Sequence, residues 1–61
     1  MKIKVYKIRT RDNKEFESVV DVETLEKSEF TYKLFYPSIY KYICATDFSG
    51  NILFEIGNKD L

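Results

Sequence analysis

The chain of 61 residues contains no histidine, no tryptophan and a single cysteine, Cys44. A lone cysteine excludes a disulfide within one chain, and a structural zinc site would have one thiol and no imidazole to use. General acid–base catalysis usually relies on histidine. A thiol nucleophile also needs a neighbouring base or a helix N-terminus to become a thiolate. We therefore expect Cys44 to be a small buried hydrophobic residue.

Glycine and proline are also scarce, with Gly50, Gly57 and Pro37 as the only examples. Two distant glycines cannot form a phosphate-binding loop. Acidic residues are plentiful, but no loop around Asp21 and Glu23 has the spacing of a magnesium or calcium site. The sequence therefore predicts a protein that is not an enzyme and uses neither a cofactor nor a metal ion.

A net charge and a long apolar run are both missing. Ten lysines and arginines balance ten acidic residues, and the isoelectric point is about 6.2. Proteins that bind nucleic acids without sequence preference are normally strongly basic, and so are polybasic membrane anchors. No apolar segment approaches the roughly 20 residues that span a bilayer. We expect a soluble protein of the cytoplasm, or of the host cell cytoplasm if the source is a virus.

A chain of this length makes one small domain, which we expect to be rich in β-structure, with residues 57–61 as a loose tail. Such a domain buries only about 60% of the surface that its unfolded chain exposes, so its stability is marginal. Because disulfides and zinc are excluded, dense packing or self-association must compensate. Five tyrosines and five phenylalanines favour both routes.

The charge that is present is strongly patterned along the chain. Residues 1–14 carry six basic residues and one acidic residue, whereas residues 15–29 carry six acidic residues and one basic residue. The two stretches meet at the turn signal Asp12-Asn13. The simplest explanation is a β-hairpin over 2–22 in which opposite charges face each other, each good pair contributing roughly 0.2–1 kcal/mol.

Loop length would decide which charges pair in this hairpin. A loop of three residues places Arg9 opposite Glu17, whereas a loop of two residues places Lys4 opposite Asp21. Either register joins bases to acids across the two strands.

Residues 23–28 suit an exposed turn or a single helical turn, and the alternation that follows predicts a strand over 28–36. Pro37 ends that strand because it has no backbone N–H. Residues 38–46 fit a further strand by propensity, although Pro37 would also suit the first position of a helix. Asp47 to Asn51 then predicts a hairpin loop, with Gly50 in a left-handed conformation.

Together these segments predict a mainly β protein, a small antiparallel five-strand curled sheet or an SH3/OB-like barrel. The alternative is an α+β fold, with residues 37–46 as a short helix packed on a four-strand antiparallel sheet. A tight turn at Pro37-Ser38 would leave both faces of the third and fourth strands apolar. Such a sheet either closes on itself or covers its second face with another molecule.

We therefore predict a non-catalytic protein–protein interaction module whose partner is another protein or a second copy in a homodimer. One hypothesis is an inhibitor of a host enzyme, encoded by a virus or a plasmid, because the acidic run could imitate nucleic-acid phosphates. The opposing interpretation is that the aromatic rings simply fill the core. The predicted partner-binding residues are Phe35, Tyr36, Tyr40 and Tyr42.

The alternative function is a small β-barrel nucleic-acid-binding protein that uses the basic first hairpin, with tyrosines as stacking platforms. The predicted nucleic-acid-binding residues are Lys7, Arg9, Arg11 and Lys14. The acidic residues beside this hairpin weaken that interpretation, since they neutralise its charge.

Overall fold

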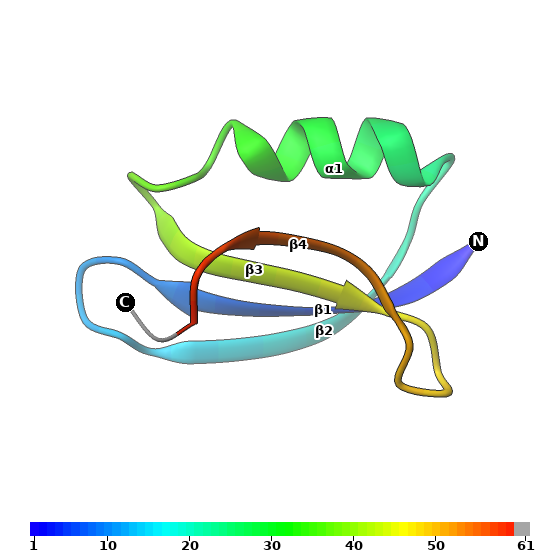
Figure 1. Cartoon of the computed structure of the whole chain (residues 1–61), viewed down its shortest axis with the longest axis horizontal. Coiled ribbons are helices and arrows are strands. Elements are labelled where there is room, and N and C mark those ends of the chain that lie inside the picture. The colour runs from blue at the N-terminus through cyan, green and yellow to red at the C-terminus, as the bar shows by residue number, and fades with distance from the viewer. Residues whose placement is uncertain (60–61) are drawn as a thin grey trace.

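The computed structural model describes residues 1–59 and shows four antiparallel strands in one open sheet plus one short helix (Figure 1). The sheet order is β2-β1-β3-β4, so β2 and β4 form its two edges. The elements are β1 (Lys2–Arg9), β2 (Glu15–Asp21), α1 (Leu25–Lys33), β3 (Tyr40–Thr46) and β4 (Ile52–Gly57).

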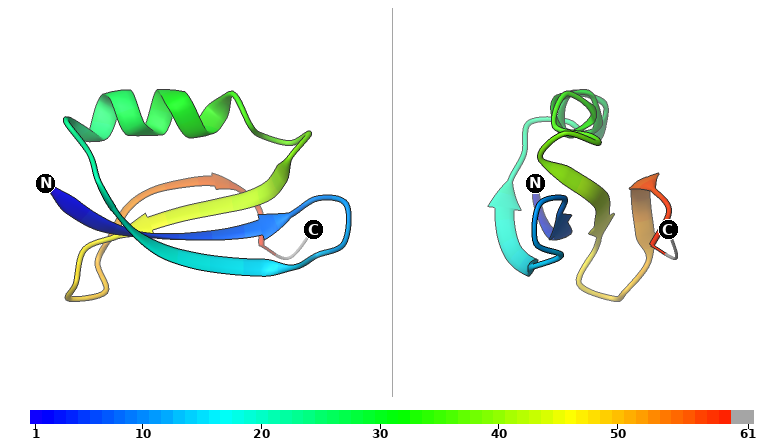
Figure 2. Two further views of the ribbon diagram at one scale, coloured as in Figure 1. Left: turned by 180° about the vertical axis from the view of Figure 1, so that it is seen from behind. Right: turned by 90° about the vertical axis from the view of Figure 1, so that its left-hand side faces the viewer.

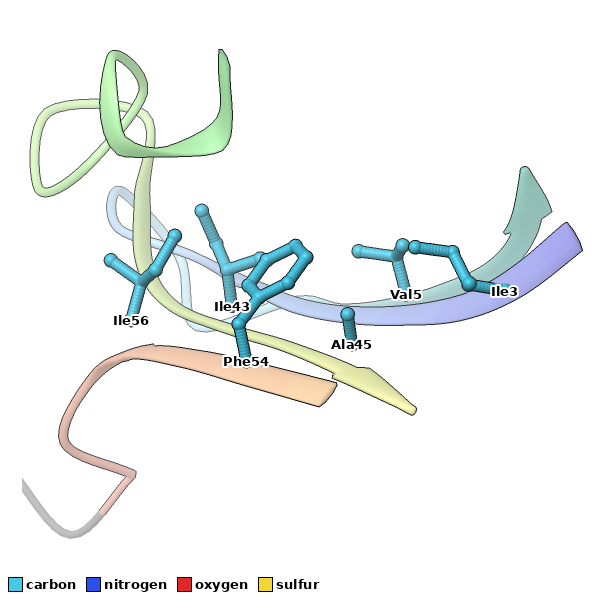
Figure 3. Packing of buried hydrophobic residues seen from close by; sticks show 6 residues of the cluster. All are labelled: Ile3, Val5, Ile43, Ala45, Phe54 and Ile56. Carbon is cyan, nitrogen blue, oxygen red and sulfur yellow. The ribbon is translucent and has the colours of Figure 1, made fainter. Parts of the chain in front are cut away.

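The helix lies across one face of the sheet and leaves the other face open (Figure 2). The main core is on the covered face, where alternate residues of β1, β3 and β4 point toward α1 (Figure 3). Four of its six side chains are at most 1% exposed. The members of this cluster are Ile3, Val5, Ile43, Ala45, Phe54 and Ile56.

The prediction of a mainly β fold is confirmed, but the prediction of five strands and a barrel is wrong. The error lies at residues 28–36, which were predicted as a strand and mostly belong to α1. Thr24 caps this helix by accepting a hydrogen bond from the Lys27 backbone N–H at 3.1 Å. Two ion pairs, Lys27–Glu23 and Lys33–Glu29, each join residues one helical turn apart and support the helix.

Residues 40–46 form the predicted strand, and the alternative of a helix over 37–46 is wrong. The α+β alternative did anticipate a four-stranded antiparallel sheet with one helix, but it assigned the helix to the wrong segment. Residues 34–39 instead make consecutive turns, in which Phe35 C=O accepts from the N–H groups of Ile39 and Tyr40. These turns carry the chain from the end of α1 back to the sheet.

The loop between β3 and β4 was predicted correctly. Asp47 Oδ1 accepts the backbone N–H groups of Ser49 and Asn51. Gly50 has φ +90°, as the left-handed position requires. Thr46 pairs with Ile52. A register shift between Ala45 and Thr46 then displaces the pairs farther from the loop by one residue relative to that pair.

The register of the first hairpin differs from both predictions. Residues 10–13 form the loop, and Ile8 pairs with Glu15 while Tyr6 pairs with Glu17. Only Lys2 and Asp21 place opposite charges directly across the ladder. Cross-strand charge neutralisation is therefore not what aligns the two strands.

The ion pair that holds this loop is local. Arg9 donates to both carboxylate oxygens of Asp12, at 3.0 and 2.6 Å. This hydrogen bonding holds the pKa of Asp12 well below its usual range. Asn13, which follows, adopts φ 59°, a conformation that asparagine tolerates well.

The tail predicted over 57–61 begins one residue later than expected, because Gly57 is still the last residue of β4. Lys59 turns back over the open face, where its Nζ lies 5.4 Å from the centre of the Tyr6 ring. The rest of the predicted tail, 60–61, lies outside the described residues.

Candidate functional site

The four aromatic residues predicted to bind a partner do not form one surface. Phe35 and Tyr40 are half-buried between α1 and the sheet, with ring centres 6.4 Å apart. Phe35 also packs against Tyr32, again at 6.4 Å. Tyr32 and Tyr40 pack against the main core, and Phe35 contacts both of their rings.

Tyr42 and Tyr36 lie elsewhere. Tyr42 is buried on the open face of the sheet together with Ile8 and Cys44. Tyr36 is 39% exposed in the turns after α1, beside Gly57 at the end of β4. The expectation that Cys44 is a buried hydrophobic residue agrees with this placement.

The open face has a row of polar and aromatic contacts that crosses all four strands. The Tyr6 and Tyr42 rings meet edge to face, with centres 6.0 Å apart. Tyr6 donates its hydroxyl hydrogen to Glu15, and Tyr42 donates to Glu55. The first bond raises the pKa of Tyr6 to about 12. Burial, followed by the bond to Glu55, raises the pKa of Tyr42 as well.

The four predicted nucleic-acid-binding residues are also divided. Lys7 points toward the helix side, where its Nζ lies 5.2 Å from the Tyr40 ring centre. Arg9 and Lys14 flank the ring of Phe16, at 5.1 and 5.5 Å. Arg11 is exposed in the adjoining loop. Arg9, Arg11 and Lys14 thus lie at one end of the molecule. Lys7 pairs with Phe16 in the same hairpin, but it directs its ammonium group toward Tyr40 and Tyr32.

A groove of about 350 Å³ lies between α1 and β2, a site that the sequence reasoning missed. Its walls come from the end of β2 with the connection that follows, and from one side of the helix. The lining residues are Val20, Asp21, Val22, Glu23, Thr24, Lys27, Ser28, Thr31, Tyr32 and Phe35. Ser28 is 8% exposed, and its buried hydroxyl has no hydrogen-bond partner among residues 1–59.

The strand beside this groove has a free edge. Arg9 N–H donates to Lys14 C=O at 2.8 Å, and Val22 N–H donates to Met1 C=O at 2.7 Å. Hydrogen-bonded and non-hydrogen-bonded pairs alternate along an antiparallel ladder. The backbone groups of Phe16, Ser18 and Val20 therefore point toward β1, by the register that joins the two strands.

The intervening residues of β2 consequently direct their N–H and C=O groups away from the sheet. These residues are Glu15, Glu17, Val19 and Asp21. In the described part of the chain, no other strand pairs with this edge. An unpaired edge of this kind is a template for a further strand.

Exposed apolar side chains continue from the groove onto the helix. Phe30 and Leu34 are each 67% exposed and lie one turn apart. Lys27, Thr31 and Leu34 follow one another along one side of the helix, and the first two line the groove. The predicted strand over 28–36 would put Phe30 and Leu34 on one strand face, so it did not anticipate these two exposed side chains on the helix. The cap at Thr24 and the ion pairs one turn apart were the signals that could have revealed it.

Two further features are absent from the described residues. Among residues 1–59, no three histidine, cysteine or acidic side chains gather closely enough to hold a metal ion. The same range contains no helix with the length and apolar character needed to cross a membrane. Comparisons with protein-family models, with curated proteins and with solved structures found no match to this chain.

Proposed function

We propose that this protein is a non-catalytic interaction module that binds an extended segment of another protein along the free edge of β2. The observation that carries the proposal is the coincidence of that edge with the groove beneath α1. Backbone hydrogen bonds from an added strand would supply affinity, and alternate side chains of that strand would enter the groove.

Two properties of the site favour a bound strand over an empty edge. The outward N–H and C=O groups of Glu17, Val19 and Asp21 are already held in strand geometry by β1, so binding orders only the partner. Exposed apolar side chains are also present, because Val19 on the edge strand is 55% exposed and Leu34 at the end of α1 is 67% exposed. Exposed apolar patches near a groove are typical of binding surfaces.

The proposal can be tested with a displayed library of random peptides and two variants of one residue. Val19→Pro removes an outward N–H that is not needed for pairing with β1, and proline is tolerated on edge strands. Val19→Thr preserves that N–H and nearly the same shape. We expect selected peptides to bind the wild type and Val19→Thr but to lose at least about tenfold in affinity for Val19→Pro.

Circular dichroism should show that both variants keep the fold. Peptides that bind Val19→Pro as tightly as the wild type would contradict strand addition at β2, and so would failure to select any peptide. The hypothesis that the bound partner is a host enzyme inhibited by a viral or plasmid protein stays a prediction. Loss of a purified enzyme's activity on addition of the wild type, but not of Val19→Pro, would support it.

A second candidate function, nucleic-acid binding, has one observation in its favour. Arg9 and Lys14 lie on either side of the Phe16 ring, at the end of the sheet where Arg11 is also exposed. Cations around an aromatic ring are typical of surfaces that bind single-stranded nucleic acid. The double variant Arg9→Glu with Arg11→Glu should abolish binding of an oligonucleotide and its salt dependence. Unchanged affinity for that oligonucleotide would exclude this function.

A further inference from the structure

The chemistry of the edge strand indicates which kind of segment it takes, an inference that rests on the proposed function. We infer that the partner is an extended segment with lysine or arginine at alternate positions and apolar residues between them. The basic side chains would lie over the open face of the sheet, and the apolar ones would face α1. The two faces of β2 beside its free edge differ in the same way.

The open-face side of β2 is acidic. Glu15, Glu17 and Asp21 project from that side, together with Val19. Side chains of an added strand would lie directly opposite these residues, about 4.5–5.5 Å away between Cβ atoms. The lysines of β1 lie on the far side of β2 from the added strand. Asp21 is paired with the Met1 amino group at 2.9 Å, and Glu15 accepts from Tyr6, so Glu17 in the middle of the strand is the acid that no other described side chain engages. Basic residues at these positions would therefore be favoured.

The helix-facing side of the same strand is apolar or small. Val20 at the end of β2 and Val22 in the connection after it line one side of the groove, and Thr31 of α1 and Phe35 in the turns after α1 line the other. Ser28 lies on the helix face between these walls, with its hydroxyl unpartnered in the described chain.

Asp21, Glu23 and Lys27 also line the groove, but they are largely exposed and already paired, Asp21 with the Met1 amino group and Lys27 with Glu23. Burial of a charged side chain against the apolar residues would therefore be costly. Alternation of basic and apolar residues in the partner follows from the alternation of the two faces.

The same charges disfavour a second copy of this chain at the β2 edge. Antiparallel pairing of two such edges centred on Val19 would set Glu17 opposite Asp21 of the other copy. Pairing centred on Ser18 would set Glu15 opposite Asp21 of the other copy. Like charges directly opposite each other destabilise strand pairing, and edge charges are a common protection against self-association.

The experiment uses the full chain and two synthetic peptides as long as the strand, which has 7 residues. One peptide alternates lysine with valine, and the other alternates glutamate with valine. Amide hydrogen exchange followed by NMR reports where each peptide binds, and fluorescence anisotropy reports its affinity. We expect the lysine peptide to protect the amides of Glu17, Val19 and Asp21, while Ser18 and Val20 are protected with or without peptide.

A charge reversal then tests the chemistry separately from the location. Glu17→Lys should weaken binding of the lysine peptide at least about fivefold and strengthen binding of the glutamate peptide. Glu26→Lys is the matched control, because Glu26 is an exposed residue on α1 that does not line the groove. Added salt should weaken the lysine peptide's binding to the wild type.

The possible failures point to different steps. If both peptides protect the edge amides equally and Glu17→Lys has no effect, strand addition holds but the inferred basic partner is wrong. If neither peptide protects these amides, the proposed function fails as well. A dimer in solution that protects the same amides without peptide would show that a second copy occupies the edge, which would overturn the inference.

Discussion

The helix-covered face and the open face of the sheet bury their side chains in different ways. On the covered face, Ile3, Val5 and Ile43 are almost fully excluded from solvent by α1 and by one another. On the open face, Ile8 and Tyr42 reach nearly the same burial without a second layer of secondary structure. Neighbouring rings, the hydroxyl–carboxylate bonds and Lys59 provide the cover there.

This difference suggests that the two faces respond differently to the loss of volume. A cavity inside a closed layer loses packing contacts on all sides, whereas a gap beside solvent can be filled by water or by neighbouring side chains. The covered face should therefore dominate the free energy of unfolding. The open face should instead confer sensitivity to pH, because its contacts include titratable groups.

The largest expected effect is the loss of unfolding free energy when one isoleucine on each face is shortened to alanine. Ile43→Ala on the covered face should destabilise the protein by roughly 2–5 kcal/mol, because its surroundings are closed. Ile8→Ala on the open face should fall at or below the lower end of that range. Urea denaturation of both variants, followed by circular dichroism, measures the two losses. Equal losses would contradict the distinction between the faces.

The two glycines with positive φ provide the next comparison. Gly57 lies opposite Tyr42 on the open face, and a Cβ there would be 2.5 Å from the Lys41 carbonyl oxygen. At Gly50 in the β3–β4 loop, nothing lies within 4 Å of such an atom. Gly50→Ala should therefore cost only the backbone strain, about 1–2 kcal/mol.

Gly57→Ala should cost about 1–3 kcal/mol more, because steric overlap is added to that strain. Thermal denaturation of both variants measures the difference. Similar melting temperatures for the two would show that the end of β4 relaxes away from Lys41. In that case the open face would be more adaptable than its burial implies.

Much of the sheet could be predicted from local sequence signals. β-Branched and aromatic residues predict the strands, and the Asp47 to Asn51 loop combines an aspartate cap with a glycine at the position that needs positive φ. The register of the first hairpin could not be derived in this way. It depends on a loop of four residues held by Arg9 and Asp12, whose ion pair was not foreseen.

The helix was mistaken for a strand because its residues satisfy two periods at once. Apolar residues at every second position from Phe30 to Tyr36 also include pairs spaced by four, which is helical spacing. The capping hydrogen bond at Thr24 and the two ion pairs favour the helix. The groove lies between α1 and the end of β2 with the connection that follows, so an incorrect assignment of the helical segment concealed the site.

The smallest expected effect is a loss of stability in alkali that belongs to the open face. Tyr6 in the folded protein has its pKa raised to about 12 from 10.0, mainly by its hydrogen bond to Glu15. A raised pKa favours the protonated phenol in the folded state. The contribution of this bond is therefore complete below pH 10 and is lost as the pH rises toward 12.

Tyr6→Phe should accordingly be less stable than the wild type at pH 8, with the gap closing as the pH rises above 10. Because the Tyr6 side chain is only half-buried, the gap should be less than about 1 kcal/mol. Urea denaturation of both proteins at several pH values measures it, and the other titrating groups are common to the two. Glu15→Gln serves as the control, since it retains an acceptor but removes the charge that raises the phenol's pKa. A gap that stays constant from pH 8 to pH 12 would mean that this bond does not link folding to ionisation, and the open face would then differ from the covered face in packing alone.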